Sequence, residues 1–403
     1  MGVTFQDVSA ATSRIADSVL RTPCPLSVPL SEATGMRVYC KLELLQRTGS
    51  FKERGARNAL LLLSPAQRVH GVIAASAGNH ALGLSYHARL LDIPVTVVMP
   101  QTAPLTKIEN CRKLSANVLI EGADIEEARK FALRLASESK FTCINGYNDD
   151  AIIAGQGTIG LEILEQVPDV EALLIPIGGA GLAAGVGLAI KTLKPAVQII
   201  GIQPERVGSY AAAKAVGRPV LVQMKPTLAD GLAVPCVGDN AFALARQYVD
   251  RDIVVSEHWI ALAVLRLMEL EKMVVEGAGA VPLAACLAGL VPELKGRTVV
   301  IPLCGGNIDM GTVGRVIERG LAVDGRLVRF SATISDKPGG LARFAALIAE
   351  EGASILDITH DRAFASEDIT TVTVYCIVET RNHEHINQLR VRLKQENVGT
   401  SWL

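Results

Sequence analysis

Short apolar runs alternate with helical patterns through the first three quarters of the chain. Runs rich in Val, Ile, Leu and Ala predict buried strands; these are Val38–Leu42, Gly71–Ala75, Val95–Met99, Asn117–Ile120, Ala172–Ile177, Gln198–Gln203 and Thr298–Leu303. Amphipathic or alanine-rich stretches predict the helices Lys52–Leu63, His80–Leu91, Leu105–Leu114, Ile125–Ala136, Ala151–Gln166 and Leu182–Thr192. This alternation indicates a doubly wound α/β fold, in which ligands bind at the carboxyl ends of the strands.

The pattern changes near residues 320–326. Period-two and helical spacings then follow in the order β-α-β-β-α, at residues 328–334, 341–348, 354–359, 372–378 and 386–393. This order predicts a small ferredoxin-like domain. We therefore expect one domain over residues 1–320, with a small lobe at roughly 71–148 inserted in a large lobe, and a second domain over residues 327–403.

Composition and charge narrow the class of protein. The 40 basic and 41 acidic residues give a net charge of −1 without a block of like charge, so we expect neither a nucleic-acid nor a membrane partner. The N-terminus lacks the pattern of a signal peptide, and the uncharged stretch 172–190 contains Pro176 and five glycines, which favours a strand, a turn and a helix start over a membrane span. Eight scattered cysteines predict reduced thiols in a cytoplasmic protein.

Two motifs near the N-terminus carry candidate chemistry. Lys52, in Ser50-Phe51-Lys52, stands at a predicted helix start, where the helix dipole disfavours a cation and so favours the neutral amine of a nucleophile. An ordinary exposed lysine is the alternative. Ser76-Ala77-Gly78-Asn79-His80 follows a strand and opens a helix, and it predicts either a carboxylate site or a plain helix cap.

Two further motifs follow later strands. Gly178-Gly179-Ala180-Gly181-Leu182 lies between a strand and a helix, where glycines let the backbone close on a phosphate. The same glycines also fit a loose dinucleotide fingerprint, but the next strand ends in Gln203 instead of an acid. Cys304-Gly305-Gly306-Asn307 predicts either a buried core thiol or a weak proton donor to a ring nitrogen.

In this order, the four motifs resemble those of the threonine/serine dehydratase family, which are pyridoxal-phosphate enzymes of the tryptophan-synthase-β fold, or fold type II. The resemblance covers roughly residues 5–320, and the C-terminal segment resembles an ACT domain, a regulatory module. The combination is similar to the medium-length threonine ammonia-lyases. It implies a two-lobed lyase that converts L-threonine to 2-oxobutanoate and ammonia, and L-serine to pyruvate.

The resemblance also implies a role for each matching residue. Lys52 would bind pyridoxal 5′-phosphate as a Schiff base and then remove the α-proton before the β-hydroxyl leaves. The remaining cofactor contacts would be Phe51 against the ring, Asn79 at its 3′-oxygen, Cys304 at its nitrogen, and Gly178, Gly179, Ala180, Gly181 and Leu182 around the phosphate. The substrate would be held by Ser76, Gly78, His80, Asp230 and Gly231.

Three positions depart from the family pattern. Ala180 replaces a glycine of the phosphate loop. The Cβ of an alanine is tolerated at this position if φ is negative there. Cys304 stands where many members carry Ser. Gln203 stands where the metal-binding members carry Glu, so no metal site is expected.

Competing functions follow from the same residues. The family's racemases place a Ser, as a second acid/base, where this chain has Ala77, so elimination is favoured over serine racemisation. A hydroxyaspartate dehydratase is disfavoured because no Arg motif stands near the site. From other classes, a nicotinamide oxidoreductase and an amino-acid sensor are the alternatives. The ACT resemblance implies a homo-oligomer, dimer or tetramer, with isoleucine, valine or a nucleotide as effector, although Gly339-Gly340 also fits a plain tight turn.

Overall fold

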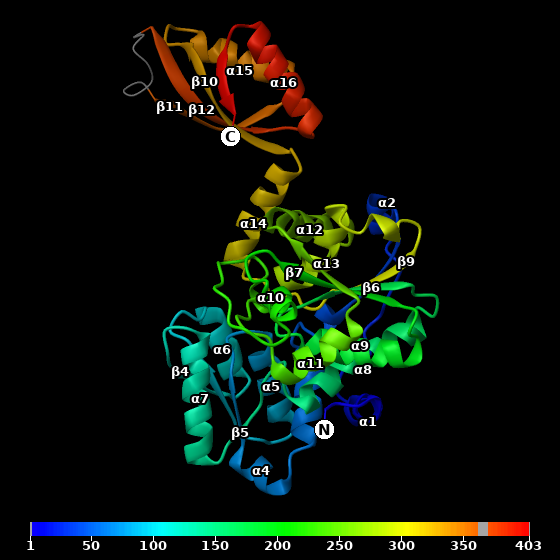
Figure 1. Cartoon of the computed structure of the whole chain (residues 1–403). Coiled ribbons are helices and arrows are strands. Elements are labelled where there is room, and N and C mark those ends of the chain that lie inside the picture. Colours follow the sequence, from blue (N-terminus) through cyan, green and yellow to red (C-terminus); the bar gives the residue numbers. More distant parts are fainter. Residues whose placement is uncertain (1, 362–369, 403) are drawn as a thin grey trace. The chain divides into compact units, whose positions relative to one another are not determined.

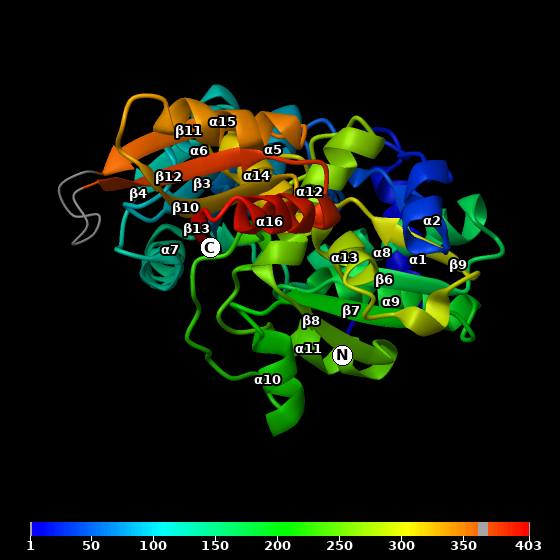
Figure 2. The same ribbon diagram turned by 90° about the horizontal axis from the view of Figure 1, so that it is seen from above.

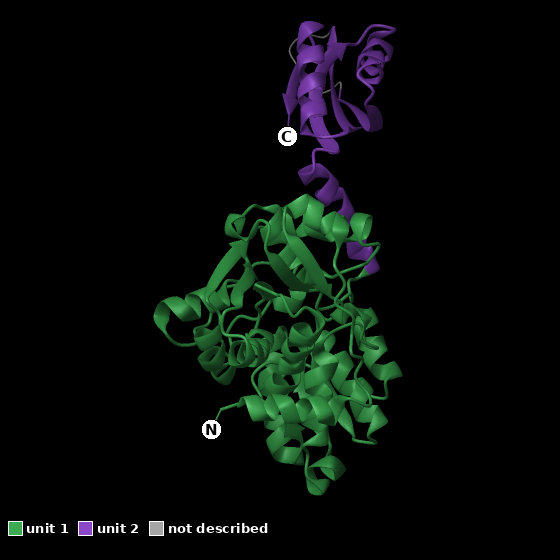
Figure 3. Cartoon of the chain, turned by 90° about the vertical axis from the view of Figure 1, so that its right-hand side faces the viewer, with its two compact units in different colours: residues 1–309 green, residues 310–403 purple. Residues whose placement is uncertain are grey.

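The computed structural model describes residues 2–361 and 370–402. The chain forms two compact units, Met1–Asp309 and Met310–Leu403 (Figure 3). The division falls ahead of helix α14 (Met310–Val323), whereas the sequence placed the end of the first domain at residue 320. In the described part of the chain, no helix is long and apolar enough to cross a membrane.

A five-stranded parallel sheet with the order β1-β9-β6-β7-β8 forms the large lobe of the first unit. Figure 2 shows β6, β7 and β8 lying side by side. The strands are β1 (Arg37–Lys41), β6 (Ala172–Pro176), β7 (Gln198–Pro204), β8 (Arg251–Val255) and β9 (Thr298–Pro302). The sequence missed β8, because this edge strand is only partly buried and begins with the charged pair Arg251-Asp252.

Helices cover both faces of this sheet (Figure 1). One face carries α12 and α13, and the other carries α8, α9 and α11. These helices are α8 (Asp150–Gln166), α9 (Gly181–Leu193), α11 (Asp239–Tyr248), α12 (Glu257–Leu270) and α13 (Gly277–Leu287). The first unit also contains α1 (Phe5–Ile15), α2 (Val28–Thr34), η1 (Glu43–Leu45), α3 (Lys52–Leu61), α4 (Pro65–His70), α10 (Ser209–Val216), η2 (Asp230–Leu232) and η3 (Pro292–Leu294).

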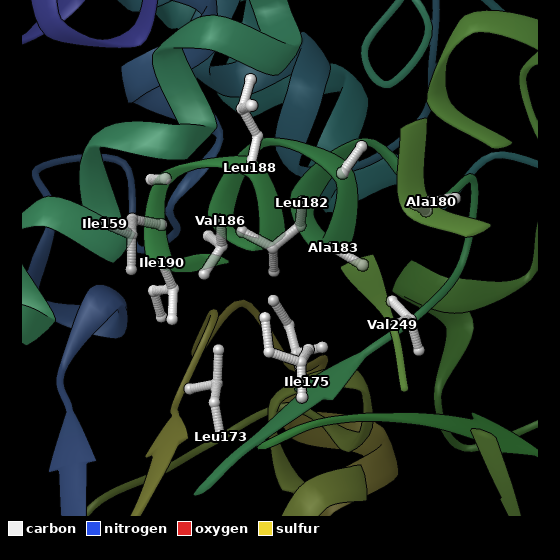
Figure 4. Packing of buried hydrophobic residues seen from close by; sticks show 14 of the residues in the cluster. Ile159, Leu173, Ile175, Ala180, Leu182, Ala183, Val186, Leu188, Ile190 and Val249 are labelled. Carbon is white, nitrogen blue, oxygen red and sulfur yellow. The ribbon is translucent and has the colours of Figure 1, made fainter. Parts of the chain in front are cut away.

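The packing of α9 on β6 fixes the loop between them. Figure 4 shows Val186 and Ile190 of α9 facing Leu173 and Ile175 of β6. All four side chains are buried. Because both faces of β6 are covered, its sequence is continuously apolar rather than alternating. The glycine-rich loop at residues 177–180 is therefore held at the carboxyl end of a rigid strand.

A second parallel sheet, with the order β4-β3-β2-β5, forms the small lobe. Its strands are β2 (Val72–Ala75), β3 (Val95–Met99), β4 (Asn117–Ile120) and β5 (Thr142–Cys143), and its helices are α5 (Asn79–Leu90), α6 (Leu105–Lys113) and α7 (Ile125–Ser139). The expected strands and helices of both lobes are present, with small shifts at their ends. The sequence missed β5, which has only two residues.

The second unit contains an antiparallel sheet with the order β11-β12-β10-β13. Its elements are β10 (Leu327–Ser335), α15 (Gly340–Glu350), β11 (Ser354–Asp361), β12 (Thr371–Glu379), α16 (His383–Gln395) and β13 (Gly399–Trp402). The βαββαβ order is ferredoxin-like, as expected, with β13 added at an edge. Gly339 has a φ of +91°, and a Cβ on Gly340 would overlap the carbonyl of Ser335, so this turn requires its glycines.

Candidate active site

One cavity of about 760 Å³ lies where strand ends of the two sheets meet. Every predicted site residue lines it: Phe51, Lys52, Ser76, Gly78, Asn79, His80, Gly178, Gly179, Ala180, Gly181, Leu182, Asp230, Gly231 and Cys304. Since these residues are spread over more than 250 positions of the chain, only the fold brings them together. Such a convergence at strand ends is where α/β sheets bind ligands.

Lys52 is the first residue of α3, and its amine points to a backbone group. Its Nζ donates a hydrogen bond of 2.6 Å to the carbonyl of Gly146 and lies 5.2 Å from the centroid of the Phe51 ring. Burial lowers the pKa of Lys52 to about 8, and the Glu276 carboxylate opposes that shift. Since Lys52 is half-buried and its amine is hydrogen-bonded inside the cavity, the alternative of an ordinary exposed lysine is wrong.

The first and fourth motifs are hydrogen-bonded to each other. Ser50 and Gly305 form an antiparallel bridge, Phe51 N donates to Cys304 O at 3.0 Å, and Gly306 N donates to Gly49 O at 2.9 Å. These contacts place Cys304 beside the start of α3. Burial raises the pKa of the Cys304 thiol, which therefore stays protonated and neutral.

The second motif opens helix α5 without a side-chain cap. Its N-cap is Gly78, and neither Ser76 nor Asn79 accepts a hydrogen bond from the first turn. The plain-cap alternative is therefore wrong, and the first N–H groups of α5 have no partner within the helix. His80 is buried: its Nε2 lies 3.2 Å from Ile144 O, and burial followed by the nearby Lys52 lowers its pKa to about 3. A neutral imidazole cannot form an ion pair with a carboxylate.

The glycine loop packs so closely against Tyr147 that Gly179 and Gly181 have no room for a side chain. A Cβ on Gly179 would overlap the ring of Tyr147, and one on Gly181 would overlap the Tyr147 carbonyl. Ala180 has a φ of +73°, so the negative φ under which we expected alanine to fit is not observed. Alanine in this left-handed region costs roughly 1–2 kcal/mol. Helix α9 begins directly after it with no side-chain cap, so its first N–H groups are open to an anion.

The loop Asn145–Asp149 is a part of the site that the sequence did not reveal. Gly146 O accepts from Lys52, Tyr147 packs against the glycine loop, and Asn148 Oδ1 accepts from Asn240 N at 2.9 Å. A Cβ on Gly146 would come within 2.5 Å of the His80 ring. The loop joins β5 to α8, and its Asn-Gly-Tyr-Asn sequence was the available turn signal.

Charged side chains from both lobes stand at the cavity. Lys107 Nζ lies 3.0 Å from Asp230 Oδ2, which links α6 of the small lobe to η2 of the large lobe. Arg129 also lines the cavity and lies 3.6 Å from Glu126. No Arg motif near the site was recognised in the sequence, but the structure brings Arg129 of α7 to the cavity.

Glu276 is the second residue that the sequence missed. It is 5% exposed, lines the cavity as the N-cap of α13, and accepts from Asn79 Nδ2 at 2.7 Å. Burial, followed by the charge of Asp230, raises its pKa to about 7. The glycines that follow it, at 277 and 279 in the first turn of α13, were the signal that could have marked it.

Comparison with known proteins identifies the family. Residues 15–305 match the family model described as pyridoxal-phosphate dependent enzyme. The chain belongs to this family. It is 44% identical over 387 residues to a Thermotoga maritima protein named L-threonine ammonia-lyase, and the match covers 96% of each chain. Among solved structures, it resembles the processed form of threonine deaminase isoform 2 from Solanum lycopersicum (TM-score 0.75, 34% identity, 78% and 92% of the two chains covered). It also resembles maize serine racemase (TM-score 0.75, 33% identity, 80% and 99% covered).

The cavity fits the cofactor of this family, pyridoxal 5′-phosphate. An amine with a lowered pKa suits its aldehyde, and a bare glycine loop at an uncapped helix start suits its phosphate. The alternative of a nicotinamide-dependent oxidoreductase, which was based on the dinucleotide fingerprint of the glycine loop, is not supported by the structure. Gln203 Oε1, at the end of β7, is engaged by Tyr210 N at 2.9 Å and is not available to a ribose. Among the described residues, no three His, Cys, Asp or Glu side chains group as metal ligands.

Proposed function

We propose that this protein is an L-threonine ammonia-lyase that converts L-threonine to 2-oxobutanoate and ammonia, and also accepts L-serine. The observation that carries the proposal is the half-buried Lys52 amine, which lies in one cavity with the glycine loop and Cys304. The full-length similarity to a protein named L-threonine ammonia-lyase supports the choice of substrate.

The protein's own groups supply binding and proton transfer. The bound cofactor supplies an electron sink for the α-carbon of the substrate. Gly178 to Leu182 would hold its phosphate through backbone N–H groups, with Phe51 and Asn79 at its ring. Lys52 Nζ, when neutral, would remove the α-proton, since a catalytic base works best with a pKa near the working pH.

Neutral side chains serve two roles in this proposal: Cys304 favours elimination, and His80 takes part in binding the substrate. A protonated Cys304 facing the ring nitrogen would place no full negative charge there, which disfavours a long-lived carbanion. Ser76 and the uncapped N–H groups of α5 would hold the substrate carboxylate, with Gly78, His80, Asp230 and Gly231 around it. Because His80 is buried and neutral, its contribution would be a hydrogen bond rather than a charge.

Steady-state kinetics test the substrate directly. We expect release of 2-oxobutanoate from L-threonine, a slower or equal rate with L-serine, and loss of both in Lys52→Ala. Thr106→Ala, at an exposed position, serves as the control and should keep both activities. Absence of 2-oxobutanoate from a cofactor-loaded wild-type enzyme would contradict the proposal.

Serine racemisation is the second candidate, favoured by the similarity to maize serine racemase. Racemisation needs a second acid/base on the other face of the substrate. Ala77 lines the cavity and carries no exchangeable side-chain proton. Chiral analysis of L-serine incubations separates the two, and rapid accumulation of D-serine would favour the racemase.

We also propose that the second unit is an ACT domain and that the enzyme is a cytoplasmic homo-oligomer. The ferredoxin-like sheet with an open edge at β11 supports pairing of copies, and eight free thiols, all in the described part of the chain, support a reducing location. Sedimentation should give a dimer or tetramer. Isoleucine, valine or a nucleotide should change the kinetics of the full chain if the domain is regulatory.

A further inference from the structure

Glu276 makes hydrogen bonds that tie two of the four motifs together, the one that contains Asn79 and the one that contains Gly305 and Asn307. Its carboxylate accepts from Asn79 Nδ2 at 2.7 Å and from the backbone N–H of Asn307, and its own N–H donates to Gly305 O at 3.0 Å. A Cβ on Gly305 would lie 2.5 Å from Glu276 Oε1, so the carboxylate is held against bare backbone. None of the predicted site residues performs this task.

The partners of Asn79 determine which way its amide faces. Asn307 Nδ2 donates to Thr48 O at 2.7 Å and to Asn79 Oδ1 at 2.8 Å. An amide nitrogen only donates, so the Asn79 atom beside it must be the oxygen. An ionised Glu276 only accepts, so the Asn79 atom beside it must be the nitrogen. One of the two Nδ2 protons is then used by Glu276, and the second remains for the cavity that Asn79 lines.

We propose that Glu276 is a positioning residue, which holds Asn79 so that the second amide proton is donated to the ring oxygen of bound pyridoxal phosphate. The inference rests on the proposed assignment of Asn79 to the cofactor. Without Glu276, the amide is fixed only by Asn307 and loses the partner that keeps its nitrogen in place. A donor that is already oriented costs less to bind than one that must be ordered.

An ionised Glu276 offers only acceptors to Asn79 Nδ2. A protonated Glu276 keeps one acceptor oxygen but adds an O–H donor, which can compete with Asn307 for the Asn79 oxygen. The titratable groups that face Glu276 are Asp230 of η2, Lys107 of α6, Lys52 of α3 and Cys304 after β9, and the Asn79 amide of α5 also faces it. Burial and Asp230 raise the pKa of Glu276 to about 7, so the network changes its protonation near neutral pH.

The test compares three single variants, Glu276→Leu, Glu276→Gln and Asn79→Ala. It also includes the two double variants that combine Asn79→Ala with each substitution of Glu276. Apoprotein is titrated with pyridoxal phosphate for affinity, and the absorption band of the loaded protein is followed from pH 5 to pH 9 without substrate. We expect Glu276→Leu to weaken binding about 10- to 100-fold, the range for a hydrogen bond to a charged group. Glu276→Gln should bind within a few-fold of wild type but lose the spectral transition near pH 7.

A double-mutant cycle decides between positioning and a general structural effect. In the Asn79→Ala background, Glu276→Leu should have little further effect on affinity, because its partner is already absent. Glu165→Gln, which removes an exposed carboxylate, should match wild type in both measurements. If Glu276→Leu does not fold, Glu276→Ala replaces it in the cycle and should show the same dependence on Asn79.

Two results would overturn the inference: additive losses in the cycle, or a Glu276→Leu protein with wild-type affinity and spectrum. Failure of the proposed function looks different. A wild-type protein that shows the expected cofactor binding and cycle but releases no 2-oxobutanoate would leave the role of Glu276 standing and remove the threonine assignment.

Discussion

Replacing Arg54 should destabilise the first unit strongly, because Arg54 is the centre of a buried ionic network. Its guanidinium is 1% exposed and contacts Glu43 at 2.7 and 2.8 Å and Glu162 at 2.7 and 2.9 Å. Lys41 Nζ contacts Glu162 at 2.5 Å and Thr22 O at 2.6 Å. Two cations thus balance two carboxylates away from water. Because Arg54 lies in helix α3 two residues after Lys52, the network also holds the start of this helix in place.

Arg54→Met keeps most of the side-chain volume but leaves Lys41 alone with two buried carboxylates. Breaking a buried pair by removing one partner costs about 3–5 kcal/mol, because the remaining charge is uncompensated. Adding Glu43→Gln to Arg54→Met restores one cation against one carboxylate. We therefore expect the double variant to be more stable than the single one.

The penalty should also depend on pH. In the wild type, burial opposes ionisation of Glu43, but Arg54 overcomes this and lowers the pKa of Glu43 below its usual value. The stability this pair supplies is present above the unfolded-state pKa and is lost as pH falls through the folded one. In Arg54→Met the unpaired carboxylate can take up a proton at low pH, so the loss should be smaller at pH 5 than at pH 8.

Urea unfolding measures these differences. A Trp402→Phe background leaves the fluorescence of Trp259, in α12, to report on the first unit alone. This separation matters because a chain of two units need not unfold in one step. A loss below about 1 kcal/mol for Arg54→Met, the size expected of an exposed pair, would refute this account of the network.

Three further predictions concern the site. Ala180→Val should lower the melting temperature markedly and Ala180→Gly should not, because β-branched residues tolerate the observed left-handed backbone worst. Equal melting temperatures for the two variants would contradict the positive φ of Ala180. In apoprotein, the rate at which an amine reagent modifies Lys52 should rise with pH around a midpoint near 8. Peptide mapping follows this rate, and a midpoint near 10.5 would exclude the lowered pKa of Lys52. The folded-state pKa of Glu276, about 7, lies above its unfolded value of 4.5, so the stability linked to it is complete below pH 4.5 and is lost as pH rises through 7. As pH rises from 5 to 8, the Glu276→Gln apoprotein should therefore gain up to about 3 kcal/mol of unfolding free energy relative to the wild type. Denaturant unfolding measures this difference, and the same pH dependence in both proteins would contradict the prediction.

The sequence predicted the parts of the site that follow strongly patterned elements. Lys52, the Asn79 motif, the glycine loop and Cys304 each adjoin a long apolar strand or a helix start, and such elements can be recognised from periodicity. The strand-end rule then predicts that they meet. The structure brings all of them to one cavity.

The missed parts depend on tertiary contacts or backbone angles. The loop 145–149 follows a strand of only two residues, which has no period to detect. Glu276 acquires its importance from Asn79, which is 197 positions away in the chain. The positive φ of Ala180 is imposed by the junction of β6 with α9, and an alanine in the sequence predicts the opposite.

The central claim is that Lys52 attaches the cofactor, and one measurement tests it most directly. The purified protein, loaded with pyridoxal phosphate, is reduced with borohydride, digested, and mapped by mass spectrometry. The account predicts the reduced cofactor on the peptide that contains Lys52, and no attachment in Lys52→Ala. Cofactor attached to another lysine, or to none in the wild type, would contradict it.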